Sequence, residues 1–531
     1  MPRLSVLNGM YLVWMIRADL RDAFDLTTEI GAIAYWQWWL THGRKEYPYV
    51  SFCLNEALRT FLSEPTDKVV QDTPVPIPLM LYLLWSSRED MRRTFDLDTR
   101  EGREGLAHWW SEHGFQDQSE LTVCVKSPES LPPTLIPQVQ QHEFQNAPIA
   151  VPTGLGEYHE GGLNLVGFAR GELGIGEDLR MAVATARCHR IPFTVYNAPI
   201  SMQSRENDPR LAGMESAEAI YRTNLIILPG METVRILVER GTGLFAHRYT
   251  IGAWQWELPS WPPILRDAYR LVQEIWAPSR YIAEAFRESA PVEVLHMPMA
   301  VEVYPEPHMD RSDFGLPPNT YIFLFVFDSL SHFARKNPLA VVSAFQRAFP
   351  IKNREVGLVI KCMNASRDHA GWRTVVESCV NDSRIITINE TFDRERILGL
   401  LNCCDAFVSL HRAEGFGRAI AEAMLLGKPV VVTNFSGNTD FTNSETAFLV
   451  DGPLIPLKKT DYHFGEGQYW CDPDVEQAAH QMLVCLEDSK LASLKAKAGQ
   501  ELIRRKFSPA SVGSMWIDRL RELGILTNYV A

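Results

Sequence analysis

The stretch SLHRAEGFGRAIAEAMLLGKPVVVTN, residues Ser409 to Asn434, decides the fold. It predicts a buried strand, a loop with two glycines, a helix that ends at Gly427 and a second buried strand. A strand, a helix and another apolar strand in this order are typical of a parallel sheet with helices on both faces. The stretch therefore predicts a doubly wound α/β domain in this part of the chain.

Short β-rich runs alternate with helical patterns on both sides of this stretch. One series comprises LNLVGFA, FTVYNAP, NLIILPG, RYTIGAW, EIWAPS and VEVLHM, and a second series begins with YIFLFVF after the prolines Pro298, Pro305 and Pro307. We expect two Rossmann-like domains, 163–303 and 304–505, followed by a C-terminal helix in 506–531. Because such sheets bind ligands at the carboxyl ends of their strands, two facing domains enclose a cleft.

Length and charge exclude several classes of protein. The chain has 531 residues, which is too long for one hydrophobic core, and 46% of them are hydrophobic. Its 52 lysines and arginines against 65 acidic residues give a net charge of −13. A nucleic-acid partner is therefore not expected, because a phosphate backbone needs clustered surplus cations.

The sequence predicts neither a membrane span nor secretion. The longest apolar runs, residues 79–85 and 321–327, have 7 residues each, whereas a spanning helix needs about 20. Charged residues interrupt the N-terminal apolar stretch, and the nine cysteines form no C-x-x-C pair. We therefore expect a cytoplasmic location, and the sequence leaves peripheral contact with the inner face of the cell membrane open.

The N-terminal segment contains an internal repeat. Seven of the 14 tryptophans fall within the first 110 residues, and residues 11–43 align without a gap with residues 82–114 at 15 of 33 positions. Each copy predicts a helix, an F-D-L-x-T turn, a second helix capped by Thr28 or Thr99, and a stop at Gly43 or Gly114. We interpret 1–117 as a tandem helical module and expect its tryptophans to pack in a core, the alternatives being a sugar-stacking or membrane-interface surface.

A segment rich in proline and glycine separates this module from the α/β part. Helical periodicity is lost in 118–162, where six prolines precede Gly154, Gly156, Gly161 and Gly162. This composition predicts a linker over 118–162.

The loop before the helix of the opening stretch holds the strongest candidates for a binding site. Gly415 and Gly417 allow the backbone to approach a ligand, and free N–H groups at the helix start favour an anion. Glu414 is placed to accept hydroxyl protons from a polyol, and Glu422, inside the helix, to take two ribose hydroxyls. The alternative is an N-terminal cap together with a solvated helix glutamate.

The block resembles the E-x7-E signature of the retaining family 4 glycosyltransferases, with their E-G-F-G turn and E-A-M-x-x-G-x-P-V-V sequence. The resemblance covers about 163–526 and implies the GT-B fold, with two facing Rossmann-like domains and a nucleotide-sugar donor in the cleft. It also implies that the C-terminal helix in 506–531 crosses back to the first domain. It implies that Glu414 contacts the donor sugar, that the amides of Gly415, Phe416 and Gly417 line it, and that Glu422 binds the ribose. Arg418 stands where an aliphatic residue is commoner in the family.

Three cations are candidates for the donor diphosphate, which these enzymes usually bind without a metal or other cofactor. Arg335 and Lys336 precede a helix that Asn337 is expected to cap, and Lys361 is expected to end the next strand. Fixed cations would stabilise the leaving group as the glycosidic bond breaks. The family usually has an arginine at the strand end, where this chain has Asp328, and a solvated basic loop is the alternative.

The first domain contributes further candidates. Gly171, Gly174 and Gly176 form a glycine-rich turn, which in the family faces the donor phosphates and acceptor; a dinucleotide site is the rival interpretation. Where many family members have a histidine, this chain has Glu257, our hypothesis for the group that contacts the acceptor hydroxyl or donor sugar. Trp256 would be a stacking platform, and packing with a salt bridge is the alternative for both.

The resemblance implies transfer of a hexosyl or deoxyhexosyl group from a nucleotide-diphosphate sugar to a growing polysaccharide or lipopolysaccharide. IGAWQWELPSWPP and QYWCDPD resemble tracts of bacterial surface-polysaccharide enzymes. The alternatives are a GT-B phosphorylase or nucleotide-sugar epimerase and, from another class, a non-catalytic glycan-binding or scaffold protein. The sequence leaves the sugar, the base, the linkage, the acceptor and the oligomeric state open.

Overall fold

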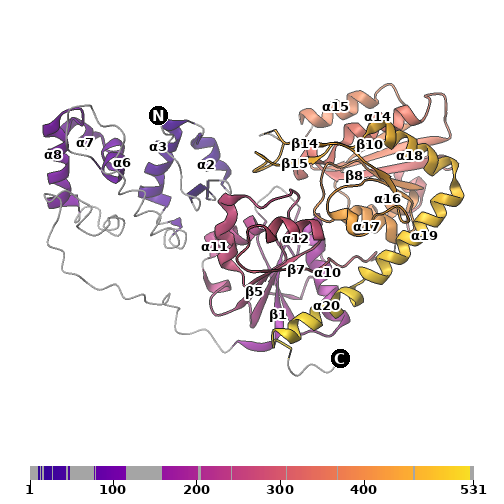
Figure 1. Cartoon of the computed structure of the whole chain (residues 1–531), viewed down its shortest axis with the longest axis horizontal. Coiled ribbons are helices and arrows are strands. Elements are labelled where there is room, and N and C mark those ends of the chain that lie inside the picture. Colours follow the sequence, from indigo (N-terminus) through magenta and orange to yellow (C-terminus); the bar gives the residue numbers. More distant parts are fainter. Residues whose placement is uncertain are drawn as a thin grey trace. The chain divides into compact units, whose positions relative to one another are not determined.

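The computed structural model divides the chain into two compact units, Met1–Gly156 with Val234–Ala246, and Glu157–Thr233 with His247–Ala531 (Figure 1). In the first unit it describes residues 10–47 apart from 12, 15, 16, 27, 44 and 45, then residue 77, residues 79–114, and 234–246 apart from 241. In the second it describes residues 158–233 and 247–526 apart from 201–204, 307, 367–368 and 459–460. Within these ranges, no helix has the length and apolar character needed to cross a bilayer.

The N-terminal helices repeat one pattern of elements. Before residue 48 these are α2 (Ala18–Ala23), α3 (Glu29–Trp38) and the π-helix η1 (Trp39–Gly43); after residue 78 they are α6 (Leu79–Ser87), α7 (Glu89–Thr94), α8 (Arg100–Trp109) and the π-helix η2 (Trp110–Gly114). Thr28 and Thr99 cap α3 and α8 as expected, by accepting from the backbone N–H groups of Gly31 and Gly102.

Contacts at identical positions explain why these residues recur. The indole N–H of Trp14 donates to the Phe24 carbonyl at 2.9 Å, and that of Trp85 donates to the Phe95 carbonyl at 2.7 Å. Trp39 and Trp110 are almost fully buried, with 0% and 1% of their surface exposed, which agrees with a packing role.

The prediction of one continuous helix before each turn is wrong in both copies. In the first copy, the backbone at Arg17 is extended (φ −106°, ψ 109°) just before α2 begins. The backbone at Arg88 is extended (φ −115°, ψ 117°), which separates α6 from α7. The Arg88 guanidinium binds Asp90 at 2.6 Å, and Glu89 and Asp90 stabilise the positive start of α7. These local contacts favour a new helix start over continuation of α6.

The predicted linker 118–162 lies outside the described residues up to 157, and its predicted end is wrong. Strand β1 (His159–Gly167) already begins at His159, which pairs with Tyr221. The register shifts between His159 and Leu163, and Gly161 has a left-handed φ of 74° there. Glycines that resemble a linker in the sequence thus form an irregularity within a strand.

The first Rossmann-like domain has a seven-stranded parallel sheet in the order β3-β2-β1-β4-β5-β6-β7. The strands after β1 are β2 (Phe193–Asn197), β3 (Glu215–Ser216), β4 (Tyr221–Ile226), β5 (Tyr249–Gly252), β6 (Glu274–Ala277) and β7 (Glu293–His296). The helices between them are α10 (Gly174–Cys188), α11 (Gly230–Arg240), the 3₁₀ segments η6 (Thr242–Leu244) and η7 (Pro263–Leu271), and α12 (Arg280–Arg287). Of these strands, only the two-residue β3 is absent from the prediction.

The second domain has a six-stranded parallel sheet in the order β10-β9-β8-β11-β12-β13. Its strands are β8 (Tyr321–Asp328), β9 (Val356–Met363), β10 (Ile385–Asn389), β11 (Ala406–Ser409), β12 (Val430–Thr433) and β13 (Phe448–Val450), and β14 (Leu454–Pro456) pairs antiparallel with β15 (Tyr469–Cys471). The helices are η8 (Arg311–Phe314), η9 (Ser329–Ser331), α13 (Phe333–Lys336), α14 (Pro338–Ala348), α15 (Ala370–Cys379), α16 (Arg394–Cys403), α17 (Arg418–Leu425), η10 (Gly437–Asp440), α18 (Val475–Glu487), α19 (Ser489–Lys506) and α20 (Pro509–Glu522). The predicted pair of doubly wound domains is confirmed.

The apolar run of β8 shows why this sheet needs helices on both faces. Phe323, Phe325 and Phe327 belong to the core under α14, α15 and α18, whereas Ile322 and Leu324 belong to the core under α16 and α17. Successive side chains of a strand point to opposite faces, so a strand without polar alternation must be covered twice.

The C-terminal helix α20 packs on the first domain, although the preceding helix α19 belongs to the second (Figure 1). Val512, Trp516, Ile517 and Leu520 share a core with β1, β4 and α10. Where the chain crosses back, the Val301 N–H donates to the Phe507 carbonyl at 2.7 Å. The two crossings between the domains are therefore hydrogen-bonded to each other.

Leu520→Ala is expected to lower the free energy of unfolding by about 2–5 kcal/mol, because the side chain is 0% exposed and its removal leaves a cavity. Urea unfolding followed by circular dichroism measures the loss. Met515→Ala on the same helix is the matched control, since Met515 is 38% exposed and should change stability little. Equal effects of the two substitutions would contradict this packing of α20.

Candidate functional site

The loop that carries Glu414 follows β11 and leads into α17. Gly417 has a φ of 92°, a left-handed backbone that glycine adopts without strain, and it precedes the first turn of α17. The Glu414 N–H donates to the Ser436 hydroxyl at 2.8 Å, and the Gly437 N–H donates to the Glu414 carbonyl at 2.8 Å. The segment after β12 therefore fixes the backbone around Glu414.

Four charged side chains of alternating sign converge beside this loop. Lys336 donates a hydrogen bond to Oε1 of Glu414, and Nη1 of Arg335 lies 3.3 Å from its Oε2. Nη2 of Arg335 lies 3.6 Å from Oε1 of Glu257, which comes from the first domain. The structure thus brings together Glu257, Arg335, Lys336 and Glu414, here called the charge cluster.

Because the charge cluster is largely shielded from solvent, its charges strongly affect one another's pKa values. Desolvation alone would raise the pKa of Glu414, but the charges of Lys336 and Arg335 outweigh it and lower the pKa to about 2. Glu414 is therefore a carboxylate throughout the neutral range. Arg335 is only 3% exposed, and it also donates to the carbonyls of Ser331 and Ala413 at 3.2 and 2.9 Å. This excludes the alternative of a solvated basic loop for Arg335.

Two predictions about neighbouring residues are wrong in detail. Asn337 precedes α14 but does not cap it with its side chain; the amide instead donates to the Leu410 carbonyl at 3.0 Å. This contact ties the start of α14 to the residue after β11. Lys361 does not end its strand, because β9 continues to Met363 in register with β8 as far as Asp328.

Lys361 lies outside the charge cluster, but it shares an electrostatic partner, Asp328, with Lys336 of that cluster. It is 3% exposed, and its Nζ lies 5.2 Å from the centre of the Phe392 ring. Burial lowers the pKa of Lys361 to about 8. The Asp328 carboxylate at the end of β8 is attracted to both Lys361 and Lys336, which puts both lysines at the carboxyl edge of the sheet.

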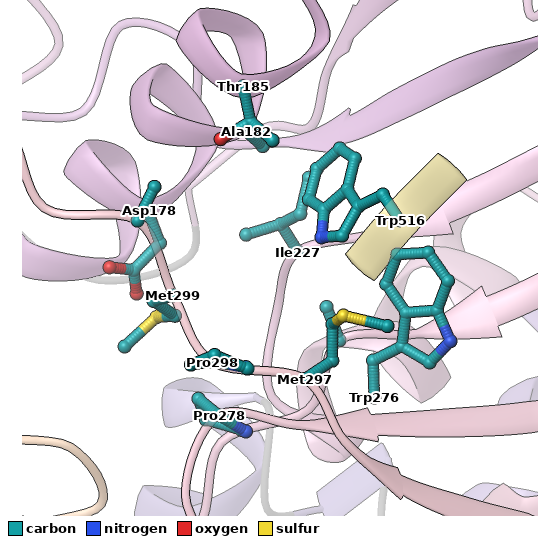
Figure 2. A pocket seen from close by; sticks show the side chains of 12 residues that line it. Asp178, Ala182, Thr185, Ile227, Trp276, Pro278, Met297, Pro298, Met299 and Trp516 are labelled. Atoms are coloured by element: carbon teal, nitrogen blue, oxygen red, sulfur yellow. The ribbon is translucent and has the colours of Figure 1, made fainter. Parts of the chain in front are cut away.

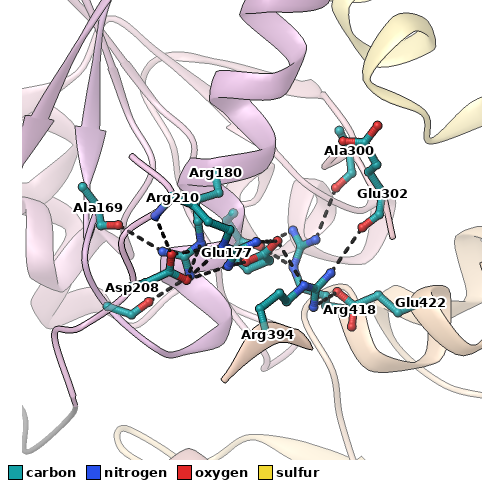
Figure 3. Close-up of polar contacts among 12 residues, drawn as sticks. Ala169, Glu177, Arg180, Asp208, Arg210, Ala300, Glu302, Arg394, Arg418 and Glu422 are labelled. Atoms are coloured by element: carbon teal, nitrogen blue, oxygen red, sulfur yellow. Dashed lines mark hydrogen bonds and ion pairs between the residues drawn. The ribbon is translucent and has the colours of Figure 1, made fainter. Parts of the chain in front are cut away.

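Glu422 lies in a polar cluster that joins the two Rossmann-like domains (Figure 3). Nη1 of Arg394, at the start of α16, donates to Oε1 of Glu422 at 2.8 Å, and its Nε lies 3.5 Å from Glu177 of α10. Arg418, which replaces the family's usual aliphatic residue, is paired with Asp178 of α10. The expected ribose-binding carboxylate is therefore held by an arginine that also faces the first domain.

Backbone carbonyls between the domains complete these contacts, as Figure 3 shows. Arg418 donates to the Ala300 carbonyl at 3.3 Å, and Arg394 donates to the Glu302 carbonyl at 3.2 Å. Burial would raise the pKa of Glu177, but Arg394 and Arg180 hold it well below its usual range. Glu177 is thus paired with arginines of both domains, and Asp178 is paired with Arg418 of the second domain.

The glycine-rich turn at the start of α10 packs against residues of that helix. α10 begins at Gly174, and a Cβ at Gly176 would lie 2.3 Å from the Gly171 carbonyl oxygen. That carbonyl accepts a hydrogen bond from Arg180 at 2.8 Å. Glycine at 176 is therefore required for this tight turn.

The expected stacking role of Trp256 does not fit its surroundings. Trp256 is 5% exposed, and its indole N–H donates to the Ser260 carbonyl at 2.9 Å. Its ring makes edge contacts with Trp261 and Tyr462, with centroids at 5.0 and 5.9 Å. Packing is therefore the interpretation that the structure favours for Trp256.

Sequence reasoning missed several residues that contact the predicted site. Tyr462 donates a hydrogen bond to Glu257, Arg394 binds Glu422, and Ser436 with Gly437 holds the Glu414 backbone. The serine and glycine after VVVTN are a turn signal that could have pointed to this segment. Tyr462 has no such signal, because its contact joins segments that lie 205 residues apart.

A small cavity adjoins the polar cluster at Asp178. It is lined by Asp178 and Ala182 of α10, Trp276, Met297 and Trp516 among others (Figure 2). Its volume is about 40 Å³. A cavity needs roughly 10–15 Å³ of such volume to hold one water molecule, so this one has room for a few.

Residues 332–455, which contain Arg335, Lys336, Glu414 and Glu422, match the family model described as Glycosyl transferases group 1. The protein is a glycosyltransferase. A comparison of this glycosyltransferase with curated proteins gave no match.

Solved structures agree with the fold of this glycosyltransferase. Sucrose-phosphate synthase from Thermosynechococcus elongatus is 13% identical with a TM-score of 0.50, and the match covers 68% of this chain and 98% of that one. A glycosyltransferase from Rickettsia africae is 16% identical with a TM-score of 0.50, and the match covers 70% and 100%. The expected GT-B fold is thereby confirmed.

Proposed function

We propose that this glycosyltransferase is a retaining family 4 enzyme that moves a hexosyl or deoxyhexosyl group from a nucleotide-diphosphate sugar to a growing polysaccharide or lipopolysaccharide. The charge cluster carries the proposal, because it places a largely buried carboxylate and two fixed cations at the strand ends between two Rossmann-like domains. A cytoplasmic location, without a nucleic-acid partner, belongs to the same proposal.

The proposed roles follow from the contacts. Glu414 accepts hydroxyl protons of the donor sugar, and the amides of Gly415, Phe416 and Gly417 line the sugar. Arg335, Lys336 and Lys361 neutralise the diphosphate and stabilise the charge that develops as the glycosidic bond breaks. Because these cations are already held in place, the diphosphate site needs no metal in this proposal.

Glu422 is proposed to bind the ribose, with Arg394 keeping the carboxylate in place through Oε1. Glu257 is proposed to contact the acceptor hydroxyl or the donor sugar, because it is the carboxylate of the first domain within the charge cluster. The turn at Gly171, Gly174 and Gly176 is proposed to face the donor phosphates and acceptor.

A thermal-shift panel of GDP-, UDP- and dTDP-sugars tests the proposal. A ligand that binds only the folded state raises its apparent stability, by about 2.7 kcal/mol at 100 times Kd. We expect one nucleotide series to raise Tm and its sugar to be slowly hydrolysed. If no donor is bound or hydrolysed across the panel, the enzyme proposal fails and the glycan-binding alternative gains support.

Two further assays separate the enzyme alternatives. An epimerase turns over the donor without an acceptor, and a phosphorylase releases a sugar phosphate when inorganic phosphate is supplied. The anomeric configuration of the transfer product, read by NMR, tests retention. Flotation with vesicles of anionic lipid tests peripheral membrane contact.

The affinity for a nucleoside diphosphate is expected to fall by about tenfold between pH 7 and pH 9. Lys361, with a pKa of about 8, loses its proton in this interval, and a neutral amine no longer attracts the diphosphate. Calorimetric titration of wild type and of Lys361→Arg measures the effect, since a guanidinium stays charged. Identical pH profiles of the two proteins would exclude Lys361 from the diphosphate site.

A further inference from the structure

Two side chains of the second domain hold one short segment of the first. Tyr462 and Gln468 lie between β14 and β15, and their partners Glu257 and Ser260 follow β5. The Tyr462 hydroxyl donates to Oε2 of Glu257. Oε1 of Gln468 accepts from the N–H and the hydroxyl of Ser260 at 3.0 and 3.1 Å, and its Nε2 donates to the Ser260 carbonyl at 2.9 Å.

Packing fixes the Tyr462 ring in place. The residue is 8% exposed, its ring lies 4.2 Å from that of His332, and Trp256 meets it edge-on at 5.9 Å. Burial and the neighbouring Glu257 raise the pKa of Tyr462 well above its usual value, so the phenol keeps its proton. The hydroxyl is thus a rigid hydrogen-bond donor to Glu257.

The Glu257 carboxylate is oriented from two sides. Oε2 accepts from Tyr462, and Oε1 faces Arg335 at 3.6 Å. A Cβ built on Gly415 would lie 3.7 Å from Cγ of Glu257 and 2.8 Å from the Trp256 carbonyl. Glu257 therefore lies directly against the turn that the proposed function assigns to the donor sugar.

We propose that Tyr462 is a positioning residue, which orients the Glu257 carboxylate at the sugar-binding turn through its hydroxyl. Gln468 fixes the backbone near Glu257 through its bonds to Ser260. The segment between β14 and β15 therefore supports the charge cluster without contributing a charged residue to it. The inference rests on the proposed function, because Glu257 needs a donor or acceptor to act on.

Tyr462→Phe isolates the hydroxyl, since the phenylalanine keeps the ring contacts. We expect kcat for turnover of the donor selected by the thermal-shift panel to fall by about 10- to 100-fold, because a misplaced reacting group loses rate steeply. The donor KM and Tm should stay within about twofold and 2 °C of wild type, because the cations and Glu414 are unaltered. Tyr469→Phe on β15, where the side chain is 44% exposed, is the matched control and should behave as wild type.

A double-mutant cycle shows whether Tyr462 acts through Glu257. In a Glu257→Ala background, adding Tyr462→Phe should change kcat less than twofold. An unchanged kcat in Tyr462→Phe, or the same loss in both backgrounds, would overturn the positioning role. In those two outcomes the wild type remains active, so the proposed function survives; a wild type inactive with every donor would overturn both.

Discussion

Replacement of Glu414 by glutamine is expected to lower turnover of the donor by about 10²- to 10³-fold, the range seen when one preorganised electrostatic contact is lost. The neutral amide cannot compensate Lys336 and Arg335, which both contact the carboxylate in the charge cluster. Hydrolysis of the donor selected by the thermal-shift panel measures the effect, and thermal unfolding reports stability in the same samples.

Loss of the Glu414 charge should also cost stability, because the buried Arg335 and the partly buried Lys336 lose a partner. Breaking such a buried pair costs about 3–5 kcal/mol, and Arg335 retains Glu257 and two backbone carbonyls as partners. Glu501→Gln on the exposed surface is the control for the same chemical change. A folded Glu414→Gln protein with wild-type turnover would rule out the proposed role.

Gly437→Ala is expected to disrupt the same loop from its backbone side. A Cβ at this position would lie 1.8 Å from the carbonyl oxygen of Gly415 and 2.4 Å from its carbonyl carbon, so the sugar-binding turn must move. We expect an activity loss of about 10²-fold from the displaced turn and a stability loss of about 1–3 kcal/mol or more from overpacking.

Turnover and Tm measure the effect of Gly437→Ala against Gly243→Ala. An added Cβ at Gly243 meets nothing within 4 Å, so this control should resemble wild type. If Gly437→Ala keeps wild-type turnover, the contact between Gly437 and Gly415 does not control the sugar-binding turn.

The pattern of elements was predictable because it depends on short-range signals. Apolar runs such as that of β8 and the caps Thr28 and Thr99 are set by neighbouring residues, and the structure has them where the sequence places them. The failures occur where tertiary contacts decide. β1 begins among glycines because β4 supplies a partner for His159, and β9 continues past Lys361 because β8 pairs with it as far as Met363.

In the candidate site, too, the residues of a local sequence pattern were predictable and their distant partners were not. Glu414 and Glu422 are eight residues apart in one strand-loop-helix unit, so their pattern is visible in the sequence. The partners that control them come from elsewhere in the chain: Arg394 binds Glu422, and Tyr462 reaches Glu257 across 205 residues. An arginine or a tyrosine in a loop has no periodicity, and only the folded arrangement assigns its partner.

The position of α20 has a consequence for how the protein is made. Its side chains belong to the core of the first Rossmann-like domain, yet α20 begins 350 residues after the start of β1. A ribosome synthesises chains from the N-terminus, and domains usually fold as they emerge. Here the first domain emerges with part of its core missing, and that apolar surface stays uncovered until the second domain has been translated and α20 has left the exit tunnel.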